Sequence, residues 1–169
     1  MKVKLFTTGG SIDKLYSTGE STFIVGEPQS ERILEEANVS LDYEVECLLR
    51  KDSLEITDAD RQMILERIAS DPHQRIVIAH GTDTMILTAK TLSQIRDKVI
   101  VLTGAMQPAA FRHTDAAFNV GGAIIAAQTL PPGVHIVMNG RVFDPHRARK
   151  NMALDRFEEV PQPRRPSEP

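Results

Sequence analysis

The stretch RIVIAHGTDTMILTAKTLSQI, residues 75–95, decides the fold. Its first five residues, 75–79, form a β-rich apolar run, and residues 84–95 carry apolar side chains at the three- and four-residue spacing of a one-sided helix. A continuous apolar run is typical of a strand that is covered on both faces, as in parallel sheets. The polar turn at residues 80–83 therefore joins a buried strand to a helix.

The same alternation recurs along the chain. Further strands are expected at residues 3–8, 43–49, 99–103 and 134–138, and further helices at 30–36, 58–69 and 115–128. This order predicts an α/β fold with three layers, α/β/α, around a mainly parallel sheet of the Rossmann-like or flavodoxin-like kind. The 43–49 run alternates with acids, which indicates a position nearer the sheet edge. Thr57 followed by Asp60 predicts a capped helix start.

Composition limits the classes of function. The formal net charge is -3, so no large field of one sign favours a nucleic-acid or membrane-surface role. Cys47 is the single cysteine, which excludes an intrachain disulfide and a cysteine metal cluster and indicates a free thiol in a reducing compartment. The chain shows neither the apolar stretch of a signal peptide nor a membrane-spanning run. We therefore expect a cytoplasmic protein.

Two stretches depart from the alternating pattern. Residues 9–29 are rich in Gly, Ser and Thr and are expected to form a long irregular loop, which is usually functional or mobile in a compact domain. Residues 161–169 contain four prolines and are expected to be an extended tail. We therefore divide the chain into a catalytic domain, 1–160, and a Pro-rich tail, 161–169.

The first strand ends in a turn that can approach a ligand. Thr8 places a hydroxyl at the strand tip, and Gly9 and Gly10 let the backbone turn sharply and come close to a bound molecule. A plain strand-ending turn or a phosphate-cradling loop are the alternatives. The dinucleotide fingerprint is absent because no third glycine follows at the required spacing.

Two further polar turns follow the third and fourth strands. Residues 80–85 read HGTDTM and residues 104–108 read GAMQP. Thr82 or Asp83 can simply cap the following helix, which is the alternative to a catalytic role. In an open α/β sheet, however, ligands bind beyond the carboxyl ends of the strands. Three glycine-bearing polar turns at successive strand ends therefore predict a binding site at this edge.

Taken in order, TGGSI at 8–12, HGTDTM at 80–85 and GAMQP at 104–108 resemble the signature of the bacterial-type L-asparaginase and glutaminase family. The resemblance covers the N-terminal domain of the usual two-domain enzyme, as in the short, single-domain asparaginases. It implies that Thr8 is the nucleophile, which attacks an amide carbonyl, expels ammonia and leaves an acyl-enzyme ester for water to cleave.

The resemblance also implies a second catalytic group of Thr82, Asp83 and Lys150. Without the resemblance, Lys150 would be interpreted as a solvated charge in a basic run. A lysine beside a carboxylate and a hydroxyl can polarise Thr82 and the water that it holds. On the substrate side, the resemblance implies that Asp83 holds the α-ammonium group, with Thr82 and Gly9 also in contact. Ser53 matches the binder of the α-carboxylate, and the backbone of Ala105 faces the leaving amide. The family needs no metal or organic cofactor.

Some positions depart from the family pattern. The family's loop tyrosine aligns with Phe23, and Tyr16, earlier in the same loop, can supply the phenol instead; an exposed loop aromatic is the alternative. Asp115 and Asn119 are expected to be caps and surface polar groups. Full-length relatives complete each active site with the C-terminal domain of a neighbouring subunit. We therefore expect a homodimer or larger homo-oligomer.

These features favour hydrolysis of L-asparagine to aspartate and ammonia. L-glutamine is a second candidate substrate, because one methylene contributes only about 1–3 kcal/mol of discrimination. Two alternatives belong to other classes of function. One is an amino-acid-binding or sensing module that has lost turnover, and the other is an ammonia-supplying amidase subunit of a tRNA-dependent amidotransferase.

Overall fold

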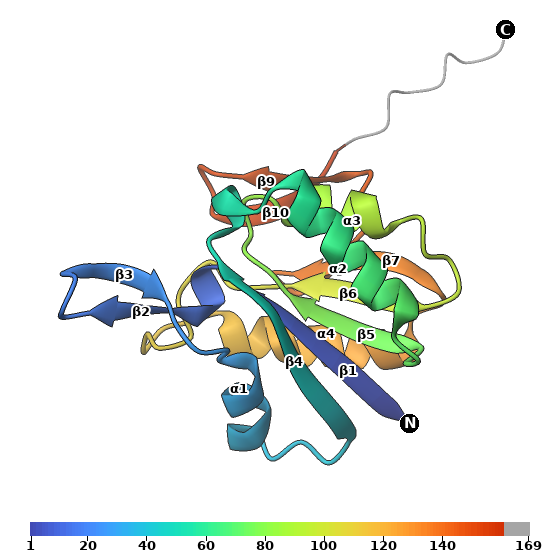
Figure 1. Ribbon diagram of the computed structural model, residues 1–169, viewed down its shortest axis with the longest axis horizontal. Helices are drawn as coiled ribbons and strands as arrows, with labels where there is room; N and C mark the ends of the chain where they lie inside the picture. Colours follow the sequence, from blue (N-terminus) through green and yellow to red (C-terminus); the bar gives the residue numbers. More distant parts are fainter. Residues whose placement is uncertain (161–169) are drawn as a thin grey trace, which may run out of the picture.

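A six-stranded sheet forms the centre of the computed structural model, which describes residues 1–160 (Figure 1). The strand order is β4 (Asp42–Lys51), β1 (Lys2–Gly9), β5 (Arg75–Ala79), β6 (Val99–Thr103), β7 (Gly133–Met138) and β8 (Arg141–Phe143). The first five strands are parallel, and β8 pairs antiparallel to β7. The expected tail, 161–169, lies outside the described residues.

The mainly parallel sheet is confirmed, and of the two kinds expected its strand order is the flavodoxin-like one. Numbered along the chain, the five parallel strands lie in the order 2-1-3-4-5. Successive connections therefore diverge between β1 and β5, and this switch point is where doubly wound sheets bind ligands. Strand β4 lies at the edge of the sheet, as its alternation with acids indicates.

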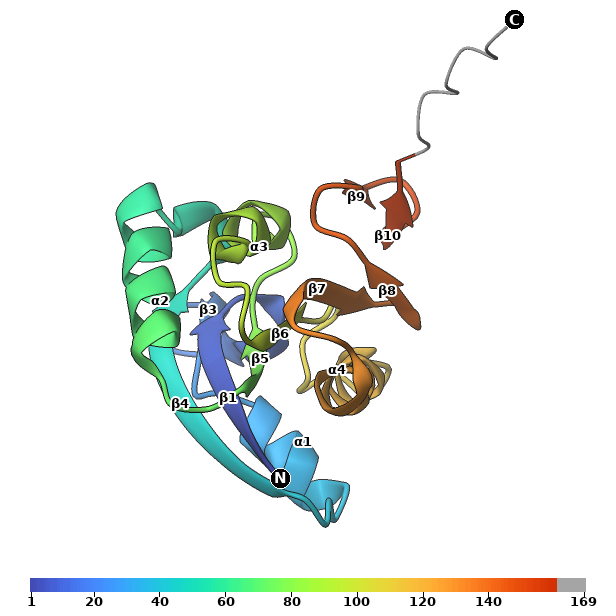
Figure 2. The same cartoon turned by 90° about the vertical axis from the view of Figure 1, so that its right-hand side faces the viewer.

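Helices cover both faces of the sheet, which confirms the three layers (Figure 2). Helices α1 (Ser30–Glu36) and α4 (Ala116–Thr129) lie on one face, and α2 (Asp58–Ser70) and α3 (Met85–Leu92) lie on the other. The buried strand residues alternate between the two cores: Ile76 and Ile78 face α2 and α3, and Val77 faces α1 and α4. Period-two alternation in strands thus gives each face its own apolar layer.

The start of α2 is fixed by its cap. The Thr57 hydroxyl accepts a hydrogen bond from the Asp60 N–H at 3.2 Å, and the Asp60 carboxylate accepts one from the Thr57 N–H at 2.8 Å. This reciprocal capping box confirms the expected helix start.

The expectation of an irregular loop at 9–29 is wrong. A short 3-10 helix, η1 (Ser11–Asp13), is followed by the hairpin of β2 (Lys14–Ser17) and β3 (Thr22–Val25). Figure 1 shows this hairpin projecting beyond the carboxyl end of β1. Its two four-residue strands are largely exposed and lack the apolar alternation of a half-buried strand, although the β-rich run at 22–25 is a usable signal.

A second hairpin, β9 (Ala148–Asn151) with β10 (Arg156–Glu159), was also absent from the sequence prediction. Its Ala148 and Phe157 side chains are buried in the same core as α2 and α3. The hairpin therefore packs on that face of the sheet and carries Lys150 with it. None of the helices within residues 1–160 is long and apolar enough to cross a membrane.

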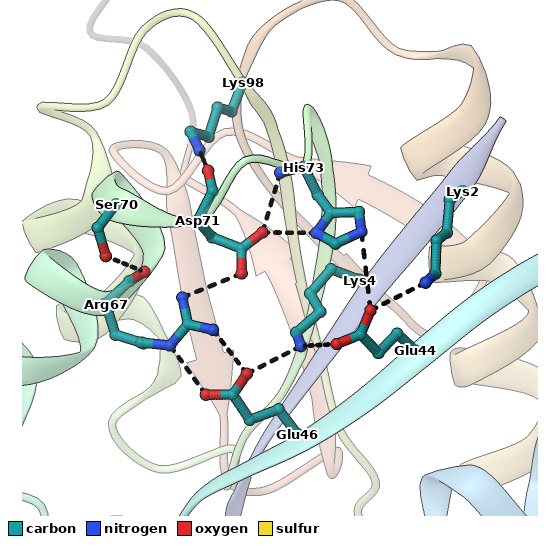
Figure 3. Close-up of polar contacts among 9 residues, drawn as sticks. All are labelled: Lys2, Lys4, Glu44, Glu46, Arg67, Ser70, Asp71, His73 and Lys98. Atoms are coloured by element: carbon teal, nitrogen blue, oxygen red, sulfur yellow. Dashed lines mark hydrogen bonds and ion pairs between the residues drawn. The ribbon is translucent and has the colours of Figure 1, made fainter.

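An ionic cluster ties β1, β4 and α2 together near the amino-terminal ends of the strands (Figure 3). The buried ammonium of Lys4 lies 2.7 Å from Glu44 and 2.8 Å from Glu46. Arg67 pairs with Glu46 at 2.7 Å and with Asp71 at 3.0 Å. Lys4 and Glu44 also face each other in the β1–β4 register, so the cluster opposes a slip of the edge strand.

Candidate active site

The turn after β1 brings two backbones into close contact. Gly9 and Gly10 adopt φ values of 91° and 92°, a backbone conformation that residues other than glycine rarely adopt. A Cβ atom on Gly10 would overlap the Cα atom of Gly81. The first and second polar turns therefore touch, which requires glycine on both sides.

Thr8 lies at the switch point between β1 and β5. Its side chain is fully buried, and its hydroxyl donates a hydrogen bond to the Ala79 carbonyl at 3.1 Å. The acceptor is a backbone carbonyl rather than a basic side chain. For Thr8 to attack a substrate, its hydroxyl must give up this bond and pass its proton to another acceptor.

Ser53 packs directly against the second turn. It begins the short helix η2 (Ser53–Glu55) that follows β4, and a Cβ atom on Gly81 would lie only 2.5 Å from the Ser53 Cβ atom. The Thr84 hydroxyl donates to the Ser53 carbonyl at 2.6 Å. The structure thus brings Ser53, Gly81 and Gly10 together at one strand edge.

Lys150 reaches the second turn from the β9–β10 hairpin. Its ammonium donates to the Thr82 hydroxyl at 2.8 Å and to the Asp83 carboxylate at 2.6 Å. The Lys150 side chain is largely buried, whereas Asp83 is partly open to solvent. The bond to Lys150 uses Oδ1 of Asp83, which leaves Oδ2 for a second cation.

His80 is a structural residue of this turn to which the sequence prediction gave no role. Complete burial lowers the pKa of its imidazole to about 4, so the ring is neutral at neutral pH. Nδ1 lies 2.8 Å from the Gly81 carbonyl and Nε2 lies 2.9 Å from the Thr88 hydroxyl. A carbonyl can only accept, so Nδ1 carries the proton and Nε2 accepts from Thr88. The neutral ring thereby ties the turn to α3.

The third turn is held by two residues from the start of α4. The Asn119 amide donates to the Gly104 carbonyl at 3.0 Å, and the Asp115 carboxylate accepts from the Met106 and Gln107 amides at 3.0 Å each. Asn119 is buried, so its assignment as a surface polar group is wrong. Asp115 occupies the cap position, but its side chain makes no capping bond to the helix. Both residues instead fix the turn that contains the buried Ala105.

Tyr16 lies outside this buried group. It is half-exposed on β2 and packs edge-to-face against Phe23, which faces it across the hairpin, with ring centroids 5.6 Å apart. Phe23 in turn contacts Phe111 at 5.7 Å. The two candidates for the loop aromatic are therefore direct neighbours. A catalytic role for Tyr16 stays a prediction.

Comparison with known proteins agrees with this arrangement of strand-end turns. Residues 2–165 match the family described as asparaginase, N-terminal. The chain belongs to the asparaginase family. L-asparaginase 1 of Escherichia coli K12 is 34% identical over 121 residues, which cover 68% of this chain and 36% of that protein. A glutamyl-tRNA(Gln) amidotransferase subunit of Methanococcus vannielii is 44% identical over 71 residues, which cover 41% of this chain and 17% of that protein.

Solved asparaginases share the fold. The thermostable L-asparaginase from Thermococcus kodakarensis superimposes with a TM-score of 0.83 at 28% identity, over 96% of this chain and 52% of that one. The chain therefore spans about half the length of this solved asparaginase. The residues that match the family, 2–165, include all three polar turns.

Proposed function

We propose that this asparaginase-family chain hydrolyses L-asparagine to aspartate and ammonia, with Thr8 as nucleophile. The observation that carries the proposal is the contact of Lys150 with Thr82 and Asp83, beside the switch point near the carboxyl end of β1, where Thr8 lies. Lys150 thus comes from a distant part of the chain to the adjacent hydroxyl and carboxylate of Thr82 and Asp83.

The reaction has two steps. The Thr8 oxygen attacks the carbon of the side-chain amide and its proton leaves to a base; the C–N bond then breaks, and the nitrogen takes up a proton and departs as ammonia. Water next attacks the resulting ester, releases aspartate and returns a proton to Thr8. Since the Thr8 hydroxyl points to a backbone carbonyl here, its proton acceptor must enter with the substrate or with movement of the nearby chain.

Lys150 supports the second hydroxyl. As an ammonium it donates to Thr82, which stabilises negative charge on that oxygen, and its pairing with Asp83 holds it in place. In its deprotonated form the Lys150 amine takes the proton of the Thr82 hydroxyl, which in turn takes one from the water that attacks the ester; general acid–base assistance of this kind contributes typically about 10²–10⁴-fold.

The substrate is held at its two charged ends. Asp83 has one oxygen free of Lys150 and binds the α-ammonium group, while the buried Ser53 binds the α-carboxylate. Backbone atoms of Gly9 and Ala105 line the space for the amide. The glycines of the first two turns let their backbones pack directly against each other and against Ser53.

The assembly is proposed to be a homodimer or larger homo-oligomer in the cytoplasm. An exposed single thiol, Cys47, is compatible with a reducing compartment. A partner copy would also cover Asp83, the exposed residue of the second turn.

A second candidate function is that of an amidase subunit that supplies ammonia to a synthetase. It is favoured by the 44% identity to a glutamyl-tRNA(Gln) amidotransferase subunit over 71 residues. This role predicts a preference for a glutamine amide and a stable complex with a larger partner.

A steady-state assay of ammonia release with both free amides separates the candidates. The proposal predicts turnover of asparagine with a higher kcat/KM than that of glutamine. Ammonia release from neither amide, together with saturable asparagine binding in calorimetry, would instead identify a binding module. Turnover of glutamine alone, together with co-purification of a partner, would favour the amidotransferase role.

A further inference from the structure

A cavity of about 590 Å³ opens beside the β9–β10 hairpin and is separate from the strand-end site. Three arginines line it, Arg141, Arg147 and Arg156, together with the carboxylates of Glu158 and Glu159. Its volume lies within the range of small-molecule sites, about 300–1,000 Å³. We refer to this cavity as the arginine pocket.

Positive charge exceeds negative charge around the arginine pocket. Glu159 pairs with Arg147 at 2.7 Å and with Arg141 at 3.5 Å. Glu158 is likewise shared between two guanidinium groups, those of Arg149 and Arg156, each at 3.1 Å. The three arginines that line the pocket, with Arg149 outside it, thus share two carboxylates.

The arginines also retain unused hydrogen-bond donors. Each guanidinium carries five N–H donors, so these ion pairs occupy only a minority of them. Nε of Arg147 has no hydrogen-bond partner within residues 1–160, but it is closed to solvent, so the donors that a ligand can reach are the terminal N–H groups of the guanidinium.

A surface network of solvated ion pairs is the simpler interpretation, and such pairs contribute little to stability. It accounts for balanced pairs, but not for the surplus of guanidinium groups around a concave surface. We propose that the arginine pocket binds a small polyanion of the phosphate class. Planar guanidinium groups donate two parallel hydrogen bonds to such oxyanions, which makes arginine the favoured residue for this ligand class.

The arginine pocket is connected to Lys150. Phe157, which also lines the pocket, faces Lys150 in the β9–β10 register. Its backbone N–H donates to the Asn139 side chain at 3.0 Å, and the Asn139 N–H donates to Asn119 at 3.1 Å. A bound polyanion therefore stiffens the hairpin that presents Lys150 to Thr82. The effect on turnover rests on the proposed function, whereas the binding does not.

Calorimetric titration of the full chain with pyrophosphate, at fixed ionic strength, tests the binding. We expect saturable 1:1 binding that weakens at least tenfold in R147Q and in R156Q. Removal of the competing carboxylate in E159Q should tighten binding severalfold, a gain that a misfolded variant cannot produce. The control R96Q alters an exposed arginine just before β6 and should bind as the unmodified chain does.

Absence of saturable binding, or equal weakening in R96Q, would overturn the site. Hydrogen exchange tests the connection to Lys150: pyrophosphate should slow amide exchange in residues 148–151 of the unmodified chain but not of R147Q. Unchanged exchange would refute the connection. Both measurements report without any ammonia release, so a failure of the proposed function stays distinguishable from a failure of this site.

Discussion

The ammonium of Lys150 lies 2.8 Å from the hydroxyl of Thr82, although 68 positions separate the two residues in the chain. The contact requires the β9–β10 hairpin to pack on the core through Phe157 and the second turn to be held by His80. The candidate catalytic group is thus a product of the tertiary fold, and the predictions below test its separate parts.

Replacement of Lys150 by methionine should leave the fold intact and abolish most turnover. Methionine fills a similar volume but cannot donate to Thr82 or Asp83, so we expect kcat to fall about 10²–10⁴-fold. Ammonia release and circular dichroism measure the two effects. The control is R149M, which changes the exposed neighbour on the same strand and should retain most activity. Equal activity of both variants would remove Lys150 from the mechanism.

Replacement of Gly81 by alanine should destabilise the protein and weaken substrate binding. The added Cβ would lie 2.5 Å from the Cβ of Ser53, so one of the two turns must shift, at a cost of about 1–3 kcal/mol. The control is G121A in α4, where nothing lies within 4 Å of an added Cβ. That substitution should stabilise the helix by about 0.5–1 kcal/mol. Urea unfolding of both variants checks the opposite signs.

Replacement of Asp13 by asparagine should stabilise the protein at high pH. Burial raises the pKa of this carboxyl to about 6 from its usual 3.8, so above pH 6 the folded state holds an unfavourable buried charge. Asparagine can still accept from the Gln29 N–H, which lies 2.8 Å from the carboxylate. We expect a gain of about 3 kcal/mol in the free energy of unfolding at pH 8. The gain should shrink as the pH falls from 6 to 4.

A gain from D13N that does not change between pH 8 and pH 4 would contradict a buried charge at this position. The exposed Asp97 provides the control, because D97N removes one carboxylate in a solvated place and should change stability little at either pH.

His80 should make the stability of D13N depend on pH. The unfolded chain binds a proton on this histidine near pH 6.5, whereas the folded chain binds it only near pH 4. Between these values the unfolded state holds more protons, so the free energy of unfolding decreases as the pH falls. Asp13 acts with the opposite sign in the unmodified chain, which should therefore show a flatter profile between pH 6.5 and 4.5. Identical slopes in the two chains would contradict this balance.

The core of the fold could be predicted from the sequence because its signals are local. The strand at 75–79 and the strand at 99–103 have the bounds expected from their apolar runs, and the helix at 30–36 has those expected from its periodicity. The expected helix at 84–95 ends earlier, at Leu92, because the chain turns there before β6. The exact ends of a helix or strand depend on tertiary contacts more strongly than its presence does.

The hairpins and the supports of the site could not be predicted in the same way. In the sequence, Lys150 is one basic residue among several. Its position at the site depends on Phe157, which anchors the β9–β10 hairpin in the core. Asn119 resembles an ordinary helix residue, but its amide joins the Gly104 carbonyl to the Asn139 N–H across three elements. Such contacts join residues that are far apart in the chain, so the local periodicity of the sequence does not indicate them.

The central claim is that Thr8 is the nucleophile, and ammonia release from asparagine by T8V, measured beside T7V, tests it most directly. Both substitutions replace a buried hydroxyl by a methyl group on neighbouring positions of β1, and within residues 1–160 the Thr7 hydroxyl has no hydrogen-bond partner to lose. The account predicts that T8V loses at least about 10³-fold in kcat, as loss of an essential nucleophile does, while T7V stays within a few-fold of the unmodified chain. Turnover by T8V equal to that of T7V would contradict it.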